Sequence, residues 1–303
     1  MRIASKLAPF VRGLLICELA THAIGQSERV TVVYTSEAGA YTEALEGMRP
    51  ALSKATLTTV DLRLPNAEAE LGRALGDASN PVVITVGKEA LERVRASKTT
   101  APLVAAMIMR AEAERVGKIG AAIHLDIPVS DVLAALKSMF PDKTRVAVIR
   151  NPAQPGQVDS AVVARGRQQG FTVTVVDSAD PQELLRAVRS LNGKVDFIVC
   201  LPDSRLYNSA TVKPLILASL ESHLLIVGFS SNFVRSGAGV GIYPDFRDIG
   251  AQAGEAAEKQ MAGQPVPAEQ GPRRLVLAVN QRVIHLLGLE YRPRREGEVL
   301  TFR

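Results

Sequence analysis

The sequence has 303 residues, of which 47% are hydrophobic and 22% are charged. A chain of this length buries a substantial core and has room for two domains, and the composition is ordinary for a globular protein. The formal charge of +5 and the pI near 9.3 would permit a nucleic-acid partner. Because the Lys and Arg residues are scattered, with few aromatic residues near them and no recognition motif, we expect a solvated basic surface and no nucleic-acid partner.

The cysteines and histidines indicate neither a metal site nor a nucleophile. Cys200 lies inside an apolar run, where a cysteine usually serves as a small buried hydrophobe, and Cys17 lies in the N-terminal segment. The histidines are isolated and have no CxxC companion: His22, His124, His223 and His285. We therefore expect no metal, no cofactor and no catalytic residue.

Residues 1–27 have the layout of a secretory signal peptide. Basic residues precede a short apolar run, and small residues follow at the −3 and −1 positions of a possible cleavage site: Arg2, Lys6 and Arg12, then residues 13–17, then Ala23 and Gly25. Pro9 and Glu18 disturb the pattern, which leaves an amphipathic N-terminal helix as the alternative. Residues 14–17 are similar to a lipoprotein box, but Ile16 is too bulky for the position before the cysteine. From the leader layout we expect export to the periplasm. No other stretch approaches the ~20 apolar residues of a membrane span.

In the first half of the chain, short β-branched runs alternate with helical patterns. This alternation predicts parallel strands connected by helices. The predicted strands are residues 29–34, 57–62, 81–86 and 102–108, and the predicted helices are residues 44–52, residues 67–75 and a helix that opens at residue 87. Residues 119–125 are expected to form the first passage to a second lobe.

The alternation begins again near Asp131. The predicted strands of this half are residues 143–150, 171–176, 197–201, 224–228 and 274–280, and its predicted helices are residues 131–141, 162–169, 181–191, 208–223, 249–261 and 281–287. Because the strand–helix series occurs twice, the sequence predicts an α/β fold with two doubly wound parallel-sheet lobes.

Small polar residues follow several of the predicted strands. In open α/β sheets, the loops at the carboxyl ends of the strands form the ligand crevice. The loops therefore predict one small-molecule site, lined by Ser36, Glu37, Tyr41, Gly87, Lys88, Asp203, Ser204, Phe229, Ser230 and Ser231.

Each of these residues also has a purely structural interpretation. Ser36 and Asp203 would cap the helices that follow them, Lys88 would point into solvent, and Phe229 would belong to the core. The sequence alone does not decide between the two roles.

Several ordered stretches resemble the "ABC transporter substrate-binding" family. They are Phe140-Pro141 before a strand and Asn151-Pro152 after it, Gly228-Phe229-Ser230, Phe233-Val234-Arg235 with Gly237-Ala238, and residues 243–250. The resemblance extends over residues 30–289 and is strongest from Asp131 onward. It implies the type I periplasmic-binding-protein fold, with residues 28–122 and 244–273 in lobe I and residues 123–243 and 274–290 in lobe II. Three crossings between the lobes would then form a hinge, and residues 291–303, which depart from the family's ending, are expected to be a mobile tail.

The resemblance also implies a function. Such proteins bind small solutes, amino acids among them, and deliver them to an ABC permease in the inner membrane; we expect a monomer. Asp203 would pair with an ammonium group, loop N–H groups and serines would hold a carboxylate, and Tyr41 or Phe229 would stack on a planar ligand. The chain departs from the family at Lys88, which replaces a small polar residue, and at Met109-Arg110, which replaces Asp-Pro.

Three other functions remain as alternatives at this point. A periplasmic sensor would present the closed lobes to a receptor kinase instead of a permease. A Rossmann-type enzyme or hydrolase would need GxGxxG or GxSxG, and neither motif is present. A sugar-repressor-like regulator would need a helix-turn-helix ahead of Arg29, which a 28-residue segment with a leader pattern does not supply.

Overall fold

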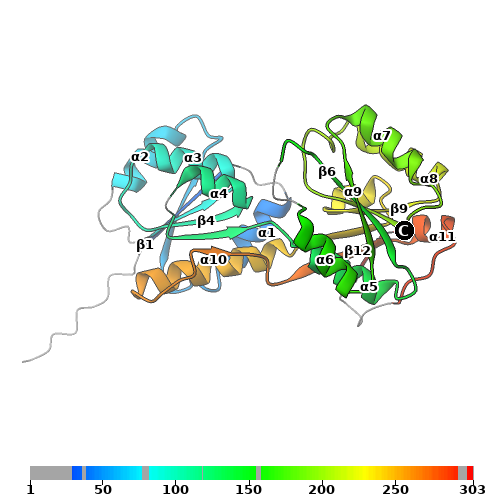
Figure 1. The fold of residues 1–303 in the computed structure, drawn as a ribbon. Helices are drawn as coiled ribbons and strands as arrows, with labels where there is room; N and C mark the ends of the chain where they lie inside the picture. Colours follow the sequence, from blue (N-terminus) through cyan, green and yellow to red (C-terminus); the bar gives the residue numbers. More distant parts are fainter. Residues whose placement is uncertain are drawn as a thin grey trace, which may run out of the picture.

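The computed structural model describes residues 29–35, 39–76, 82–117, 119–154, 158–292 and 299–302. These residues form two α/β lobes, each built on its own sheet (Figure 1). The expected leader, residues 1–27, lies outside the described residues. Among the helices that are described, none combines the length and the apolar composition needed to cross a membrane.

The first lobe, lobe I, has a six-stranded parallel sheet. Its strands lie in the order β11-β5-β4-β3-β1-β2, with the bounds Glu269–Gln270, Ala121–His124, Leu103–Ile108, Val82–Val86, Arg29–Tyr34 and Thr56–Asp61. The helices of this lobe are α1 (Gly39–Met48), α2 (Ala67–Gly76), α3 (Lys88–Ala96), α4 (Arg110–Val116) and α10 (Phe246–Met261).

The second lobe, lobe II, has a seven-stranded mixed sheet in which only β12 and its neighbour β10 run antiparallel among the described pairs. Its strands lie in the order β13-β12-β10-β9-β8-β6-β7, with the bounds Val299–Phe302, Leu275–Asn280, Val240–Pro244, Leu225–Gly228, Phe197–Cys200, Arg145–Arg150 and Thr172–Asp177. Its helices are α5 (Val129–Met139), α6 (Ser160–Gln168), α7 (Pro181–Ser190), α8 (Val212–Glu221), α9 (Ser231–Arg235) and α11 (Gln281–Leu286).

Helices cover both faces of each sheet. Successive side chains of a strand point to opposite faces, so Val30 and Val32 of β1 pack with α1 and α10. Val33 of the same strand packs on the other side, with α2, α3 and α4. Burial on both faces explains why the central strands are continuous apolar runs and not alternating ones. The prediction of two doubly wound lobes is confirmed.

The structure adds elements that the sequence reading missed. Residues 119–125 were expected to be a passage, whereas Ala121–His124 is β5 and pairs with β4. The short strands β10 and β11 and the short helices α4 and α9 were not predicted either. β11 has only two residues, Glu269 and Gln270, and only its pairing with β5 defines it as a strand. Because this pairing depends on a strand far away in the sequence, no pattern within residues 269 and 270 predicts a strand there.

The expectation of a mobile tail over residues 291–303 is wrong for the part that is described. β13 pairs in parallel with β12, and the guanidinium of Arg235 lies 5.5 Å from the centre of the Phe302 ring. At the start of this segment, the Arg292 N–H donates to the carbonyl of Met139 at 2.8 Å. The chain end departs from the family's pattern and still adds an edge strand to the sheet.

The chain passes between the sheets three times, through residues 125–128, through Asp245 and through residues 271–274. The sheets therefore assign residues 123 and 124 to lobe I and Pro244 to lobe II, which shifts two of the expected boundaries. The second and third crossings are tied together, since the Asp245 N–H donates to the carbonyl of Arg274 at 3.0 Å. Arg273 pairs with Asp248 and Glu255 of α10, which holds the third crossing on lobe I.

Helix α10 returns to lobe I and packs closely on α1, and glycines allow this approach. A methyl group on Gly250 would overlap the carbonyl oxygen of Ala44, and one on Gly47 would overlap the carbonyl of Arg247. A Cβ on Gly254 would lie 2.9 Å from the carbonyl oxygen of Met48. The two helices thus meet backbone to backbone, which only residues without a side chain permit.

Replacing one of these glycines should separate the two helices. We expect Gly250→Ala to lower the free energy of unfolding of the protein by about 2 kcal/mol or more, because the added methyl forces the backbones apart. Urea denaturation measures this change. Gly72→Ala in α2 is the matched control: a Cβ there meets nothing within 4 Å, so it should leave stability unchanged or raise it by up to about 1 kcal/mol. Equal effects of the two substitutions would contradict the close packing.

Candidate functional site

The carboxyl ends of the parallel strands carry the residues that the sequence predicted. In lobe I these residues follow β1 and β3, and in lobe II they follow β8 and β9. Ser36 and Glu37, in the loop after β1, lie outside the described residues. The other predicted residues are described.

Tyr41 and Gly87 meet at the strand ends of lobe I. A Cβ on Gly87 would lie 2.6 Å from the Tyr41 hydroxyl oxygen, and Gly87 has φ of 93°, so both space and backbone conformation require glycine. The Tyr41 hydroxyl shares a hydrogen bond with Thr35. Burial and the nearby carboxylate of Glu112 raise the pKa of Tyr41, which therefore stays neutral and able to donate.

Glu112 is a residue of this wall that sequence reasoning missed. Its Oε2 accepts the N–H of Met109 at 2.8 Å and so fixes the start of α4, directly after β4. The sequence could have indicated this role, because a glutamate three residues after the N-cap is one half of a capping box. The local arrangement depends on Met109-Arg110 opening a helix at the place where the family has Asp-Pro.

Lys88 does not join this cluster. Its side chain is about half exposed and its Nζ lies 3.8 Å from Glu92, one turn further along α3. An exposed pair of this kind contributes little to stability. The structure therefore favours the solvent-facing interpretation of Lys88.

Asp203 is buried, with 6% exposure, and its carboxylate oxygens already accept four hydrogen bonds. Oδ1 accepts the N–H groups of Arg205 at 2.8 Å and Leu206 at 2.9 Å. Oδ2 accepts the side-chain amides of Asn151 at 2.9 Å and Gln154 at 3.0 Å. An ionised carboxylate offers about four lone-pair sites, so this residue fastens the loop after β6 to the turn after β8. The geometry does not support the expected pairing with a ligand ammonium group.

The remaining predicted residues of lobe II divide between packing and exposure. Ser204 is exposed. The half-buried Phe229 ring lies 5.7 Å from that of Tyr207 and 5.2 Å from that of Phe233, measured between centroids. Ser230 caps α9, because its Oγ accepts the N–H of Phe233 at 3.2 Å.

Tyr243, the residue before Pro244 at the end of β10, is a second residue that sequence reasoning missed. Its side chain shares a hydrogen bond with the side chain of Ser231. Burial and the carboxylate of Glu43 raise the pKa of Tyr243. Glu43 belongs to α1 in lobe I, so a charge of one lobe acts on this tyrosine of the other.

Helix α1 therefore stands between the two walls. It carries Tyr41, which faces Gly87, and Glu43, whose charge acts on Tyr243. In Figure 1, α1 lies on the side of its lobe that faces lobe II. On the lobe I side, the half-buried Tyr41 with the carboxylate of Glu112 near it is an arrangement that can contact a small molecule with polar groups and a flat face.

Cys200 is buried in the core of lobe II. Burial raises the pKa of the Cys200 thiol to about 12, so Cys200 is not a thiolate nucleophile at neutral pH. Within the described ranges, no three His, Cys, Asp or Glu side chains are placed to hold a metal ion.

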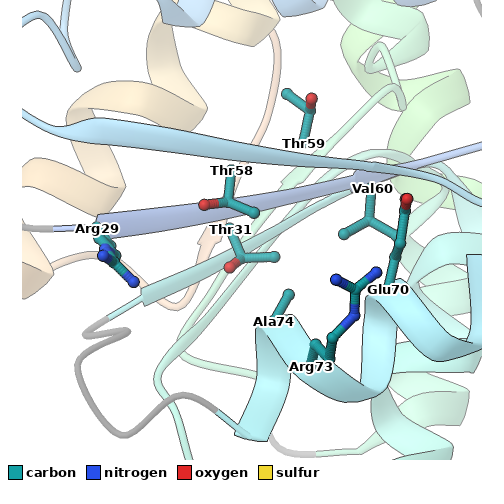
Figure 2. A pocket seen from close by; sticks show the side chains of 8 residues that line it. All are labelled: Arg29, Thr31, Thr58, Thr59, Val60, Glu70, Arg73 and Ala74. Carbon is teal, nitrogen blue, oxygen red and sulfur yellow. The ribbon is translucent and has the colours of Figure 1, made fainter.

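A pocket of about 350 Å³ lies in lobe I, away from the predicted site. It opens between β1, β2 and α2 (Figure 2), and its lining consists of Arg29, Thr31, Thr58, Thr59, Val60, Glu70, Arg73 and Ala74. None of these residues belongs to the loops at the carboxyl ends of the strands.

Asp203→Ala should destabilise the protein itself, because it leaves four buried or half-buried N–H donors without their acceptor. We expect the free energy of unfolding to fall by about 2 to 4 kcal/mol in urea denaturation. Ser204→Ala is the control: this exposed neighbour should change stability by no more than about 0.5 kcal/mol. An Asp203→Ala protein as stable as the unsubstituted chain would show that the carboxylate is not structural.

Comparison with known proteins supports the architecture. No curated protein matches the chain. Among solved structures, a ligand-free, open substrate-binding protein with adhesive properties from Clostridium difficile is similar with a TM-score of 0.71 and 17% identity, over 91% of this chain and 99% of that one. A domain in complex with L-Trp from Streptococcus pneumonia has a TM-score of 0.57 and 14% identity, over 91% of this chain and 100% of that one. A periplasmic ribose ABC transporter protein from Conexibacter woesei has a TM-score of 0.53 and 12% identity, over 86% of this chain and 95% of that one.

At these identities the solved structures show the fold alone, and the family assignment comes from the sequence. The model of the family described as "ABC transporter substrate binding protein" matches residues 73–291, which is more than half of the chain. This range includes the loops after β3, β4, β6, β8 and β9 and the three crossings between the lobes. The chain belongs to the ABC transporter substrate-binding protein family.

Proposed function

We propose that this chain is the extracytoplasmic solute-binding component of an ABC importer and that it holds a small polar solute between its lobes. The observation that carries the proposal is the pair Tyr41 and Tyr243. Tyr41 of α1 lies against Gly87 at the strand ends of lobe I, Tyr243 lies at the end of β10 in lobe II, and Glu43 of α1 acts electrostatically on Tyr243. Side chains that converge from two lobes suit a molecule that is held and later released.

The side chains of the described site favour a solute with an ammonium group and a flat face. The carboxylates of Glu43 and Glu112 lie beside the two tyrosines, and they replace Asp203 as the groups that would pair with a cation. The half-buried ring of Tyr41 offers a stacking surface, whereas the Tyr243 ring is buried and stacks on Phe246. An amino acid or a related carboxylate meets these requirements, and one relative of similar fold is described as a complex with L-Trp.

The crossings provide the mechanical part of the proposal. The second and third crossings are joined by the Asp245–Arg274 hydrogen bond and held on α10 by Arg273. Rotation of the lobes would then be concentrated in the few residues between the sheets. We propose that the closed monomer docks on a permease in the inner membrane and that the leader directs the chain to the periplasm. No chemistry on the solute is required.

The identity of the solute is best tested on protein purified without denaturation. Native mass spectrometry should show an added small molecule with an amine, which denaturation then releases unchanged. Release of a chemically altered molecule, or stabilisation by dinucleotides alone in a thermal-shift screen, would contradict the proposal.

Tyr41→Ala should weaken the binding of that solute by about tenfold or more, because it removes the stacking surface and the hydroxyl next to Gly87. Isothermal titration calorimetry with the recovered solute measures the change. Tyr41→Phe should retain the contribution of the ring, and the solvent-facing Lys88→Ala should leave affinity within about twofold. A loss of affinity in Lys88→Ala with no loss in Tyr41→Ala would place the site elsewhere.

A further inference from the structure

His124 occupies an unusual position for a titratable side chain. It is the last residue of β5, directly before the first crossing, and it is 3% exposed. A Cβ on Gly271, in the third crossing, would lie 3.4 Å from its Cε1. The imidazole is thus enclosed between the sheet of lobe I and two of the three connections to lobe II.

The contact with Arg110 determines which ring nitrogen carries the proton. Arg110 Nη2 lies 3.1 Å from His124 Nε2. Because a guanidinium only donates hydrogen bonds, Nε2 must be the acceptor and must be unprotonated. The ring is therefore neutral, with its hydrogen on Nδ1. Nδ1 is buried and has no hydrogen-bond partner among the described residues.

Arg110 also joins the first crossing to lobe I. Its backbone N–H donates to Oδ2 of Asp126, inside that crossing, at 2.7 Å. The same Oδ2 lies 3.6 Å from His124 Nδ1, which is too far for a hydrogen bond. A further carboxylate, Glu269 of β11, lies 3.7 Å from Arg110 Nη1. Hence α4, β5, β11 and the first crossing meet around one imidazole.

The charged groups that face His124 act in opposite directions. Burial lowers its pKa, and so does the guanidinium of Arg110 on α4. The carboxylates of Asp126 in the crossing and Glu269 on β11 raise it, and the net direction is downward. The folded chain therefore favours the neutral ring that the Arg110 contact requires.

We propose that the His124–Arg110 pair is a proton-sensitive latch on the hinge. When solvent delivers a proton to Nε2, an N–H of the ring faces the N–H groups of Arg110, and the contact breaks. Release of the Arg110 side chain removes its links from α4 to the end of β5 and to Glu269 of β11, so the segments that lead into the first and third crossings loosen. The latch needs no bound solute and is independent of the solute-binding proposal.

The direction of the pH dependence follows from the lowered pKa. The latched state binds fewer protons than a state in which His124 is solvated and titrates near its ordinary value of about 6.5. Lowering the pH through and below that value therefore favours the unlatched state. Until the latched ring itself titrates, the opening equilibrium should rise by up to about tenfold per pH unit.

Hydrogen exchange on the solute-free full chain tests the latch. After correction for intrinsic rates, peptides spanning residues 108–128 and 268–275 should lose protection between pH 7.0 and 5.5, by about threefold or more. Strands β8 and β9 serve as the internal reference and should not change. In His124→Gln, which keeps an acceptor for Arg110 and cannot titrate, the loss should disappear. His285→Gln, at an exposed histidine of α11, should behave like the unsubstituted protein.

A second measurement keeps the proposal testable if His124→Gln folds poorly. In spectra of histidine labelled at the ring carbon, the signal of His124 should titrate below the ordinary histidine value of about 6.5, and Arg110→Met should raise its pKa. Titration of His124 at or above that ordinary value would overturn the proposal. So would an acid-induced loss of protection that is as large in His124→Gln as in the unsubstituted chain.

Discussion

The close packing of α10 on α1 is the contact on which the two-lobed arrangement depends. α10 follows the second crossing, so it begins next to lobe II and yet belongs to the core of lobe I. Gly47, Gly250 and Gly254 let the two backbones approach without side chains between them. Because this contact positions α1 as a whole, it also positions Tyr41 and Glu43 of that helix. Packing within one lobe thereby arranges the side chains that face the other.

The polar residues at the strand ends serve two different purposes. Asp203 and Ser230 use their oxygens on N–H groups of their own lobe, and they give the loops a defined shape. Tyr41 and Tyr243 have Thr35 and Ser231 as hydrogen-bonding neighbours, with carboxylates near them. Rigid loops that support a few less constrained polar groups are what a binding site for a small molecule needs.

The connections between the lobes differ in how they are held. The third crossing is fastened to α10 by ion pairs of Arg273 with two acidic residues and by the Gln252 amide, which donates to the carbonyl of Gly271 at 3.1 Å. The first crossing relies on the Asp126–Arg110 hydrogen bond and the enclosed His124. In the proposed latch, a titratable ring next to the first connection and permanent charges on the third would make the two connections differ in their response to pH.

The sequence by itself determined the fold class, because continuous β-branched runs alternating with amphipathic helices permit little except parallel sheets covered on both faces. It also located the loops after β3, β8 and β9 as the region of interest, since strand ends follow directly from the apolar runs. The elements it missed, such as β5, β11 and β13, exist through hydrogen bonds to strands distant in the sequence, and no local pattern carries that information.

Only the tertiary structure decided what each polar residue does. The sequence around Asp203 does not show whether its carboxylate pairs with a ligand or with Asn151, some fifty positions away. In the folded chain Asn151 lies next to Asp203 and donates a hydrogen bond to it. Glu43 and Tyr243 lie about two hundred residues apart and become neighbours because α10 folds back onto α1. Side-chain type sets what a residue is able to bind, but the partner is chosen by packing, which depends on the whole chain at once.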